Sequence, residues 1–419
     1  MEKDIKKPQI RFQGFTEEWE QHKLGDYCEM YNGDRSSKYP NASDMVDDGI
    51  PFINAGDLEN GSVNLKTANN ITREKYNQLC GAKLQIGDIV YCLRGTLGKN
   101  AFIDNFEEGT IASSLVAIRP KNIDGRYLYY ILNSDIEYRQ RIVHDEGAAQ
   151  PNLSAKSVSE FEIPILSIGE QKKISEYFTK FDHLISFHQR KYDSLVKVKK
   201  SMLEKMFPRS GDKKPEIRFV GFTDDWEQRK LSELATIHAR IGWQNLRTSE
   251  FLDNGDYMLI TGTDFKDGAI NYSTCHYVEK ERYDQDKHIQ INNGSILITK
   301  DGTLGKVAYV QGLTMPATLN AGIFNVQIRN ENEVDGKYLF QYLKAPYLMN
   351  YVSQKATGGT IKHINQNILV DFPIVLPNKF EQVKIGTFFE KLDNLISLHQ
   401  CKLNLLKNMK KAMLEKMFV

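Results

Sequence analysis

The sequence lacks the motifs by which common metal, dinucleotide and acyl-transfer enzymes are recognised. It contains no GxGxxG, no HExxH and no nucleophile elbow, and its five cysteines form neither a CxxC pair nor a zinc-type spacing with histidine. None of its twelve prolines is adjacent to another, so the Asn/Asp-Pro-Pro-aromatic loop that holds a target amine for methylation is also missing. These absences favour a binding protein over an enzyme, and they predict no metal site.

A nucleotide cradle is missing too, although GTLGK occurs twice, at residues 95–99 and 302–306. A P-loop needs four residues between its glycines and a Ser or Thr after its lysine to ligate magnesium. Here two residues separate the glycines, and the lysines are followed by Asn100 and Val307. The repeated turn therefore calls for an explanation other than nucleotide binding.

The chain has no long apolar run and no signal peptide. No run approaches the roughly 20 residues of a membrane-spanning helix, and the first residues, MEKDIKKPQIRF, are charged. The scattered cysteines are typical of reduced thiols, so we expect a cytoplasmic protein. With 419 residues, 41% of them hydrophobic, the chain is long enough for two or three globular domains.

Net charge is small, but it is unevenly distributed. Residues 170–207 contain nine Lys/Arg and five Asp/Glu, and residues 381–418 contain seven and four, which gives +4 and +3. Since the whole chain carries +1, the remainder carries 1 − 7 = −6. A polyanion would therefore bind through local patches, or with the help of a partner's charge.

The chain contains an internal repeat, with several segments of its first half returning in its second half. PQIRFQGFTEEWEQHKL at residue 8 returns as PEIRFVGFTDDWEQRKL at residue 215, and the GTLGK turns keep the same offset of 207. The 38-residue segment from Glu170 returns from Glu381 with 22 identical positions. Between these matches the inserts differ. The first half has MYNGDRSSKYPNASDMVDDG, and the second half has IHARIGWQNLRTSEFLDNG, which shows almost no similarity to it. We therefore expect the two halves to share one fold and to differ in the binding partners that they contact.

Each repeated tail predicts a long helix with a heptad seam. Apolar residues alternate spacings of four and three over about five heptads, with a histidine (His188, His399) and a lysine (Lys199, Lys410) at matching positions. We expect the two helices to pair antiparallel, with the globular parts at opposite ends; the alternative is that each helix folds back on its own domain. The seam residues proposed for helix and partner contacts are Ile174, Phe178, Phe181, Ile185 and Leu195, with Ile385, Phe389, Leu392, Ile396 and Leu406.

The globular halves are mixed. QIGDIVYCL and NNGSILITK predict buried strands, as do GTIASSLVAIRP and LNAGIFNVQIRN, while DGRYLYYILNS and DGKYLFQYLKAP predict short helices. The predicted fold class is α+β, with two pseudo-symmetric mixed domains, each followed by a long helix, and the helices paired as an antiparallel coiled coil. We place the domains at residues 1–160 and 208–372, and the helical regions at 161–207 and 373–419.

In this order, the features resemble the specificity subunits of type I restriction-modification enzymes. The matching elements are the Gly-Phe-Thr…Trp openings at residues 14–19 and 221–226, the strand-GTLGK blocks, PNLSAKSVSEFEIPI and HINQNILVDFPIV, and the EQ-KI start of each helix. Each motif is weak alone, but the twice-repeated order is specific, and the resemblance covers essentially the whole chain.

The resemblance implies a non-catalytic subunit. Each globular half would be a target recognition domain for one half of a bipartite, asymmetric site in double-stranded DNA. The helices would space the domains and dock two methyltransferase (modification) subunits, while restriction (translocase/nuclease) subunits would join through the complex. S-adenosylmethionine, ATP and Mg²⁺ would belong to those partners, so no cofactor is expected in this chain. Identical domains would read a palindrome, whereas different inserts suit an asymmetric site.

Candidate DNA contacts fall into two groups. The repeated turns carry Lys, Arg and Thr side chains and backbone N–H groups suited to phosphate, although a solvated surface turn is the alternative. The divergent inserts carry candidates for base contacts, since Arg suits guanine edges and Asn or Gln adenine edges. We name Arg94, Thr96, Lys99, Lys300, Thr303 and Lys306 in the turns, Arg35, Lys38, Asn54, Arg240, Trp243, Asn245, Arg247 and Thr263 in the inserts, with Asp57 and Asp264 beside them, and Lys362 where the second domain meets its helix.

Two other classes of protein stay open at this point. One is a nuclease or methyltransferase in its own right, against which the missing motifs argue. The other is a coiled-coil scaffold that binds proteins and not DNA. Neither explains why the frame is duplicated while the inserts diverge.

Overall fold

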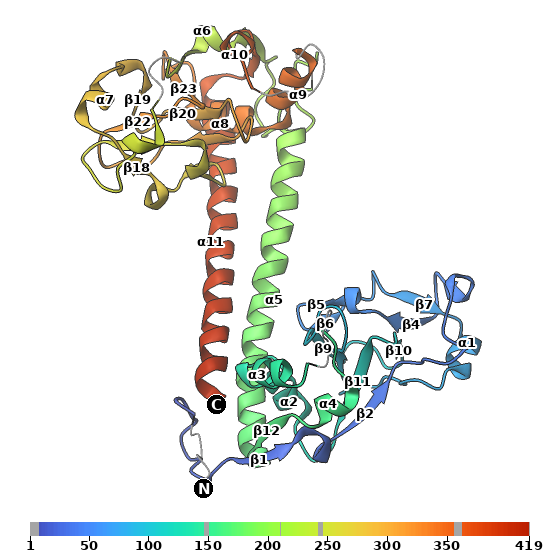
Figure 1. The fold of residues 1–419 in the computed structure, drawn as a ribbon. Helices are drawn as coiled ribbons and strands as arrows, with labels where there is room; N and C mark the ends of the chain where they lie inside the picture. Colours follow the sequence, from blue (N-terminus) through green and yellow to red (C-terminus); the bar gives the residue numbers. More distant parts are fainter. Residues whose placement is uncertain (1–7, 146–150, 210, 242–245, 356–362, 419) are drawn as a thin grey trace. The chain divides into compact units, whose positions relative to one another are not determined.

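The structure is a computed structural model that describes residues 8–145, 151–209, 211–241, 246–355 and 363–418. It divides into two compact units, Met1–Gln189 with Cys401–Val419, called unit 1, and Arg190–Gln400, called unit 2. Two long helices, α5 (Ile168–Lys205) and α11 (Lys379–Met417), each contribute to both units (Figure 1). Each unit therefore combines one globular half with parts of both helices.

Unit 1 is built on two four-stranded sheets. The first is antiparallel, in the order β2-β11-β8-β9, and the second has the order β10-β4-β7-β3 with β10 and β4 parallel. A two-stranded ribbon of β1 and β12 leads into α5. The strands are β1 (Glu20–Lys23), β2 (Cys28–Asn32), β3 (Met45–Val46), β4 (Ile50–Ile53), β5 (Leu58–Glu59), β6 (Ser62–Val63), β7 (Asn69–Ile71), β8 (Ile89–Cys92), β9 (Asn100–Phe102), β10 (Thr110–Ile111), β11 (Leu115–Pro120) and β12 (Glu162–Ile165). The shorter helices are α1 (Arg73–Gln78), α2 (Gly125–Ile131), α3 (Asp135–Val143) and α4 (Ala155–Ser159).

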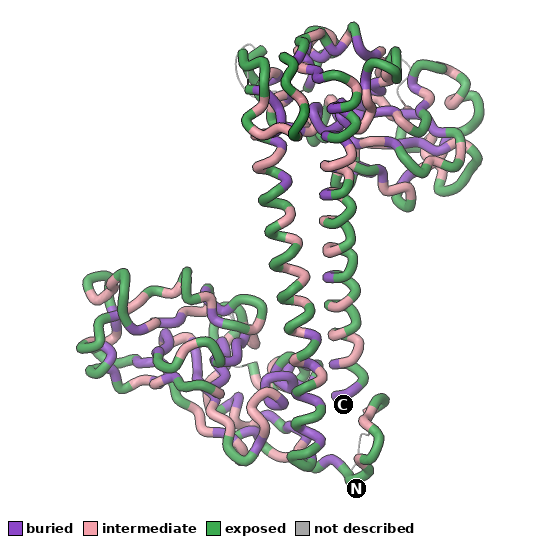
Figure 2. Tube along the Cα trace, turned by 180° about the vertical axis from the view of Figure 1, so that it is seen from behind, coloured by how far each residue is buried: buried purple, intermediate pink, exposed green. Residues whose placement is uncertain are grey.

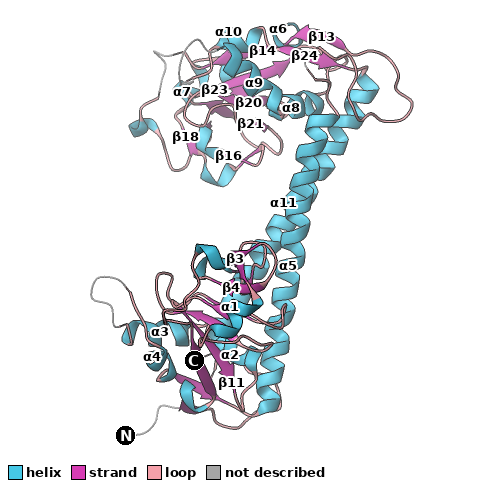
Figure 3. Ribbon diagram, turned by 90° about the vertical axis from the view of Figure 1, so that its right-hand side faces the viewer, coloured by secondary structure: helices cyan, strands magenta, loops and turns pink. Residues whose placement is uncertain are grey.

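Unit 2 repeats this frame. Its first sheet, β14-β23-β20-β21, matches β2-β11-β8-β9 strand for strand, and β15 and β22 are parallel like β4 and β10. The extra strand differs: β3 lies beside β7, whereas β19 lies beside β22. The strands are β13 (Glu227–Lys230), β14 (Ala235–Ala239), β15 (Met258–Ile260), β16 (Phe265–Lys266), β17 (Ala269–Ile270), β18 (His276–Tyr277), β19 (Gln290–Ile291), β20 (Ile296–Thr299), β21 (Val307–Tyr309), β22 (Ala317–Leu319), β23 (Ile323–Ile328) and β24 (Pro373–Leu376). The helices are α6 (Leu231–Leu234), α7 (Lys280–Asp284), α8 (Gly336–Lys344), α9 (Pro346–Lys355) and α10 (Gln366–Val370) (Figure 3).

The core of each unit includes the end of the other repeat's helix. In unit 1, Phe418 at the end of α11 stacks on Phe178 of α5, with ring centroids 6.0 Å apart. In unit 2, Phe207 after α5 stacks on Phe389 of α11 at 5.9 Å. The start of one helix therefore lies beside the end of the other in both units. This confirms the antiparallel pairing that the heptads predict.

Reciprocal ion pairs set the register of this pairing. Lys410 Nζ lies 2.5 Å from Asp182 in unit 1, and Lys199 Nζ lies 2.5 Å from Asp393 in unit 2, two pairs related by the 211-residue offset. Burial and the nearby Lys344 ammonium together lower the pKa of Lys199 to about 8, although the Asp393 carboxylate acts in the opposite direction. A buried charge at a seam position tolerates few alternative alignments, because a slipped helix would leave it unpaired.

The helices bury some rows of side chains and expose others. Figure 2 shows exposed and half-buried positions along much of both helices, in contrast to the buried strands of the globular halves. Within the part of the chain that the structure describes, no helix has both the length and the apolarity that a membrane crossing requires.

Candidate nucleic-acid interface

The two GTLGK turns have the same geometry in their two units. Each links the last two strands of the first sheet, β8 to β9 and β20 to β21. Their glycines need the left-handed region, with φ of 82° and 79° at Gly95 and Gly98 and 69° at both Gly302 and Gly305. Arg94 and Thr96 are exposed in unit 1, as are Thr303 and Lys306 in unit 2. The turns therefore present equivalent polar side chains outside the sheet.

In unit 1, three other loops meet this turn. Lys99 Nζ donates to the carbonyl of Ala55 at 2.8 Å, and Arg94 Nε donates to Oδ1 of Asn152 at 3.0 Å. The backbone N–H of Leu93 donates to Ser114 at 2.9 Å. The turn is thus joined to the loop after β4, the loop between β10 and β11, and the segment before α4.

The insert loop after β2 reaches the same place. Arg35 Nη2 donates to the carbonyl of Ser113 at 3.3 Å, next to the residue that receives Leu93 N–H. Arg35 and Lys38 are exposed, and Asn54 is half-buried. The structure therefore brings the sequence-predicted residues of the first half to one edge of the two sheets, although they come from loops far apart in the chain. It adds Ser113, which sequence reasoning did not place there, and it joins Asn152, from the segment where the first domain meets its helix, to the same edge.

Unit 2 builds the matching edge. The N–H of Lys300 donates to the carbonyl of Gly322 at 2.8 Å, and the carbonyl of Lys300 accepts from Ile364 N–H at 2.9 Å. Asn320 N–H donates to Ile260 at 2.9 Å, which places the loop after β15 beside the loop after β22. The loop after β15 carries Thr263, whose hydroxyl lies 2.7 Å from the hydroxyl of Thr261. Lys300, Thr303, Lys306 and Thr263 are therefore grouped like their counterparts in unit 1.

Asp57 and Asp264 are structural, which corrects the expectation that they contact bases. The Asp57 carboxylate accepts from Asn54 N–H at 2.8 Å and from the hydroxyl of Thr67 at 2.9 Å. Asp264 makes the same pair of bonds with Thr261 N–H and the hydroxyl of Thr274, both at 2.8 Å. The signal was in the sequence, since INAGD and ITGTD keep the 207-residue offset and the spacing of a cap.

Arg240 is buried, with 2% of its surface exposed, so its expected place in the interface does not fit the structure. Its Nε donates to the carbonyl of Leu319 at 2.9 Å, and Nη2 donates to the hydroxyl of Thr318 at 3.2 Å. Burial lowers the pKa of Arg240, and the Arg282 guanidinium lowers it further. The Arg240 side chain therefore binds strand β22 inside the unit and is not presented at its surface.

Of the other predicted contacts of the second half, Arg247 lies in the described part of the chain. Arg247 is exposed, and its N–H donates to Glu250 at 2.8 Å, at the start of a short helical turn. Trp243, Asn245 and Lys362 lie outside the described residues.

The predicted seam residues of the helices are used inside the chain. Ile174, Phe178 and Phe181 belong to the buried core of unit 1 or lie beside it, and Ile385, Phe389 and Leu392 belong to that of unit 2. Ile185, Leu195, Ile396 and Leu406 are half-buried. Sequence reasoning missed a second apolar row, whose members lie one position before seam residues and are 40–57% exposed: Leu184, Val198, Leu395, Leu398, Leu405 and Met409. The signal is the 211-residue offset, which relates Leu184 to Leu395 and Val198 to Met409.

The described residues contain no group of three or more His, Cys, Asp or Glu side chains arranged to hold a metal ion. What gathers at the two edges is a set of cations, hydroxyls, amides and glycine turns. Such groups suit phosphates and base edges. Fold and site together define a protein with two related mixed α/β domains, each with a polar edge of this kind, joined by paired helices.

Comparisons with known proteins identify the family. The model described as type I restriction modification DNA specificity domain matches the chain twice, over residues 16–197 and 223–408, so the chain belongs to this family. The MjaVIII specificity subunit of Methanocaldococcus jannaschii is 24% identical over 400 residues, covering 91% of this chain and 88% of that protein. The MjaIX specificity subunit of the same organism is 22% identical over 418 residues, covering 96% and 92%. The chain is therefore a DNA specificity subunit of a restriction-modification system and not one of its catalytic subunits.

Solved structures show the same fold. The S subunit of a type I restriction-modification system from M. genitalium has a TM-score of 0.68 at 15% identity, and each chain covers 99% of the other. A chain from a structure of the assembly and conformational transition of a type I system has a TM-score of 0.51 at 15% identity, covering 94% of this chain and 96% of that one. The predicted two-domain architecture with long paired helices is confirmed.

Proposed function

We propose that each unit reads one half of a bipartite, asymmetric site in double-stranded DNA, and that the helices dock two methyltransferase subunits. The observation that carries this proposal is the edge described above, which has one repeated turn and one divergent insert in each unit. A repeated element suits a contact common to every site, and a divergent element suits the contact that distinguishes one sequence from another.

The repeated turns would bind phosphate. Arg94 and Lys306 are exposed beside glycines whose lack of a side chain lets a phosphate approach the backbone. The divergent loops would then face the base edges, with Arg35 and Asn54 in unit 1 and Thr263 and Arg247 in unit 2. One short half-site gives limited discrimination, since each mismatched base pair costs about 1–3 kcal/mol. Two domains coupled through helices add their discrimination and make the half-site separation part of the recognition.

The second apolar row on the helices supports the docking of partners. Each residue of the row precedes a seam residue, so the row lies about 100° around the helix from the seam. A helix with two apolar rows at such an angle is typical of a bundle in which it packs on two neighbours. Because the helices are antiparallel and use the same seam, the rows of both lie on the same side of the pair. Helices of the methyltransferase subunits are the proposed occupants of this side.

Charged substitutions in this row test the docking surface. We expect Leu184→Glu combined with Leu395→Glu to weaken association with the methyltransferase subunit by about 30-fold or more, because two apolar contacts are replaced by buried charges. Association is measured by titration of the labelled chain with purified methyltransferase subunit. The matched control is Ser186→Glu with Ser397→Glu, two exposed positions on another face of the same helices. Equal loss with both pairs, or no loss with the first, would rule out this surface.

The remaining chemistry is proposed to lie in the partners. S-adenosylmethionine would bind the methyltransferase subunits, and ATP and Mg²⁺ the restriction subunits that join the complex. The working place of such an assembly is the cytoplasm, beside the chromosome.

Exchange of one recognition domain tests whether each unit reads its own half-site. We expect replacement of residues 25–160 by the corresponding domain of another specificity subunit to change one half of the methylated motif and leave the other half intact. The motif is read from the modified adenines of a host that expresses this chain with its methyltransferase. A stable complex with no DNA preference would favour the protein-binding scaffold instead.

A further inference from the structure

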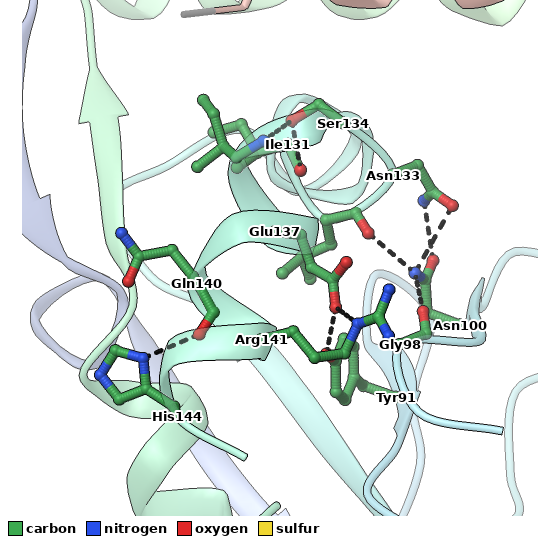
Figure 4. Close-up of polar contacts among 12 residues, drawn as sticks. Tyr91, Gly98, Asn100, Ile131, Asn133, Ser134, Glu137, Gln140, Arg141 and His144 are labelled. Carbon is green, nitrogen blue, oxygen red and sulfur yellow. Dashed lines mark hydrogen bonds and ion pairs between the residues drawn. The ribbon is translucent and has the colours of Figure 1, made fainter. Parts of the chain in front are cut away.

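The turn of unit 1 rests on a buried polar triad. Glu137, from α3, is 5% exposed and accepts hydrogen bonds from the hydroxyl of Tyr91 and, at 2.9 Å, from Nε of Arg141. Figure 4 shows Glu137 and Arg141 reaching from α3 toward Tyr91 on β8 and Gly98 in the turn. Burial raises the pKa of Tyr91, and the Glu137 carboxylate raises it further, so the phenol is a hydrogen-bond donor to that carboxylate at neutral pH.

The triad touches the turn itself. A methyl group on Gly98 would lie only 2.7 Å from Oε1 of Glu137 and 2.8 Å from Nε of Arg141. The backbone of the turn therefore lies directly against this ion pair. From the other side, Asn100 Nδ2 donates to the carbonyl of Gly98 at 2.8 Å, and Asn133 Nδ2 donates to Asn100 at 2.8 Å (Figure 4). A pocket of about 270 Å³ also adjoins Gly98 and Arg141, while Leu97 of the turn packs against the core of unit 1.

Unit 2 supports its turn without such a triad. The positions equivalent to Tyr91, Glu137 and Arg141 are Ile298, Leu348 and Val352, all fully buried in the apolar core. The turn of unit 2 instead rests on Met349, whose Sδ would lie 2.1 Å from a methyl group on Gly305.

The fold therefore does not need the polar triad, since the same frame forms with apolar residues in its place. Replacing a buried ion pair by well-packed apolar side chains is often neutral or stabilising. A network of this kind does fix the geometry of what it contacts, because every member has few alternative partners.

We propose that Tyr91, Glu137 and Arg141 are positioning residues for DNA binding by the first recognition domain, and that they hold residues 95–99 in the conformation that presents Arg94, Thr96 and Lys99. This rests on the proposed function of the turn as a DNA contact. The triad acts through the turn and touches no base, so it sets how firmly the first half-site is held. The second half-site depends on its own turn and on Met349.

The test gives unit 1 the residues of unit 2. The variant Tyr91→Ile, Glu137→Leu, Arg141→Val is prepared in complex with the methyltransferase subunits. We expect its melting temperature to be unchanged or higher, while affinity for the cognate duplex falls about tenfold, as expected for the weakening of one or two polar contacts. The slope of log affinity against log salt should become shallower, and hydroxyl-radical footprinting should show weaker protection of the DNA backbone at the half-site read by the first domain and unchanged protection at the other half-site.

Two further variants keep the proposal falsifiable if the triple variant does not assemble. Glu137→Gln keeps an oxygen that accepts from both Tyr91 and Arg141, and should bind within about threefold of the parent. Arg141→Met removes only the guanidinium and should cost about fivefold, confined to the first half-site. The control Met349→Leu lies under the second turn and should leave the first half-site unaffected.

The proposal is overturned if a variant that lacks Arg141 assembles normally and keeps full affinity and full backbone protection at the first half-site. It is also overturned if backbone protection falls equally at both half-sites, which would indicate a general loss of structure. If the parent complex itself shows no sequence preference, the proposed function fails, and that result is distinct because it needs no variant.

Discussion

Phe418→Ala is expected to destabilise the first recognition domain, although that domain ends 418 − 160 = 258 residues earlier in the chain. Phe418 is 4% exposed, stacks on Phe178 and packs against Tyr127. Removing a buried phenylalanine ring costs about 3–5 kcal/mol. Amide exchange in α2 and β8 should therefore rise by about 100-fold or more, measured by hydrogen-exchange mass spectrometry on the complex.

The symmetry of the fold supplies the control. Phe207→Ala removes the equivalent ring, which stacks on Phe389, and should raise exchange in α8 and β20 of unit 2 and spare unit 1. Asn408→Ala, at an exposed position of α11 outside the second apolar row, should change neither unit. Equal effects of Phe418→Ala on both units would contradict the account in which each core is completed by the other repeat's helix.

Arg94→Glu and Lys306→Glu are expected to weaken DNA binding by about tenfold each and by about 100-fold together. Each replaces one cation at a proposed phosphate contact, and the two lie in different units, so their effects should add. The slope of log affinity against log salt should become shallower by about one for each contact removed. Affinities are measured by fluorescence anisotropy with the assembled complex at several salt concentrations.

A cation at the other end of the same sheet is the control. Lys121 follows β11, while the interface loop precedes this six-residue strand, so the two lie about 20 Å apart at about 3.3 Å per residue. Lys121 forms an exposed ion pair with Glu29, of the kind that contributes little to stability. Lys121→Glu should therefore leave both affinity and salt slope nearly unchanged. A loss equal to that of Arg94→Glu would mean that net charge, and not the turn, governs binding.

The repeat is the reason that much of the fold could be predicted. Two copies of GTLGK at one offset indicated equivalent turns. The two heptad patterns, with Lys199 and Lys410 at matching positions, indicated helices that pack against each other. In physical terms, a pattern that recurs in one chain shows which features a fold requires, because the variable positions differ between copies. Phe207 and Phe418 follow the same logic, since both end a repeated helix and both complete a core.

The parts that the sequence did not predict depend on which loops meet in space. Arg240 follows a strand, as exposed loop residues do, but the neighbouring strand β22 supplies a carbonyl and a hydroxyl that draw it inside. Asp57 and Asp264 have the side chains of possible base contacts, but each accepts a hydrogen bond from a threonine ten residues later, which the local sequence does not reveal. Exposure and loop contact are tertiary properties, and a single sequence gives only weak information about them.

The most direct test of the account is a map of methylated adenines in a host that lacks adenine methylation and expresses this chain with its methyltransferase subunit. We expect one motif made of two different half-sites, with a modified adenine in each, separated by one fixed gap. That result would establish two unlike readers held at a set separation. A continuous motif, a palindrome, or a gap that varies from site to site would contradict it.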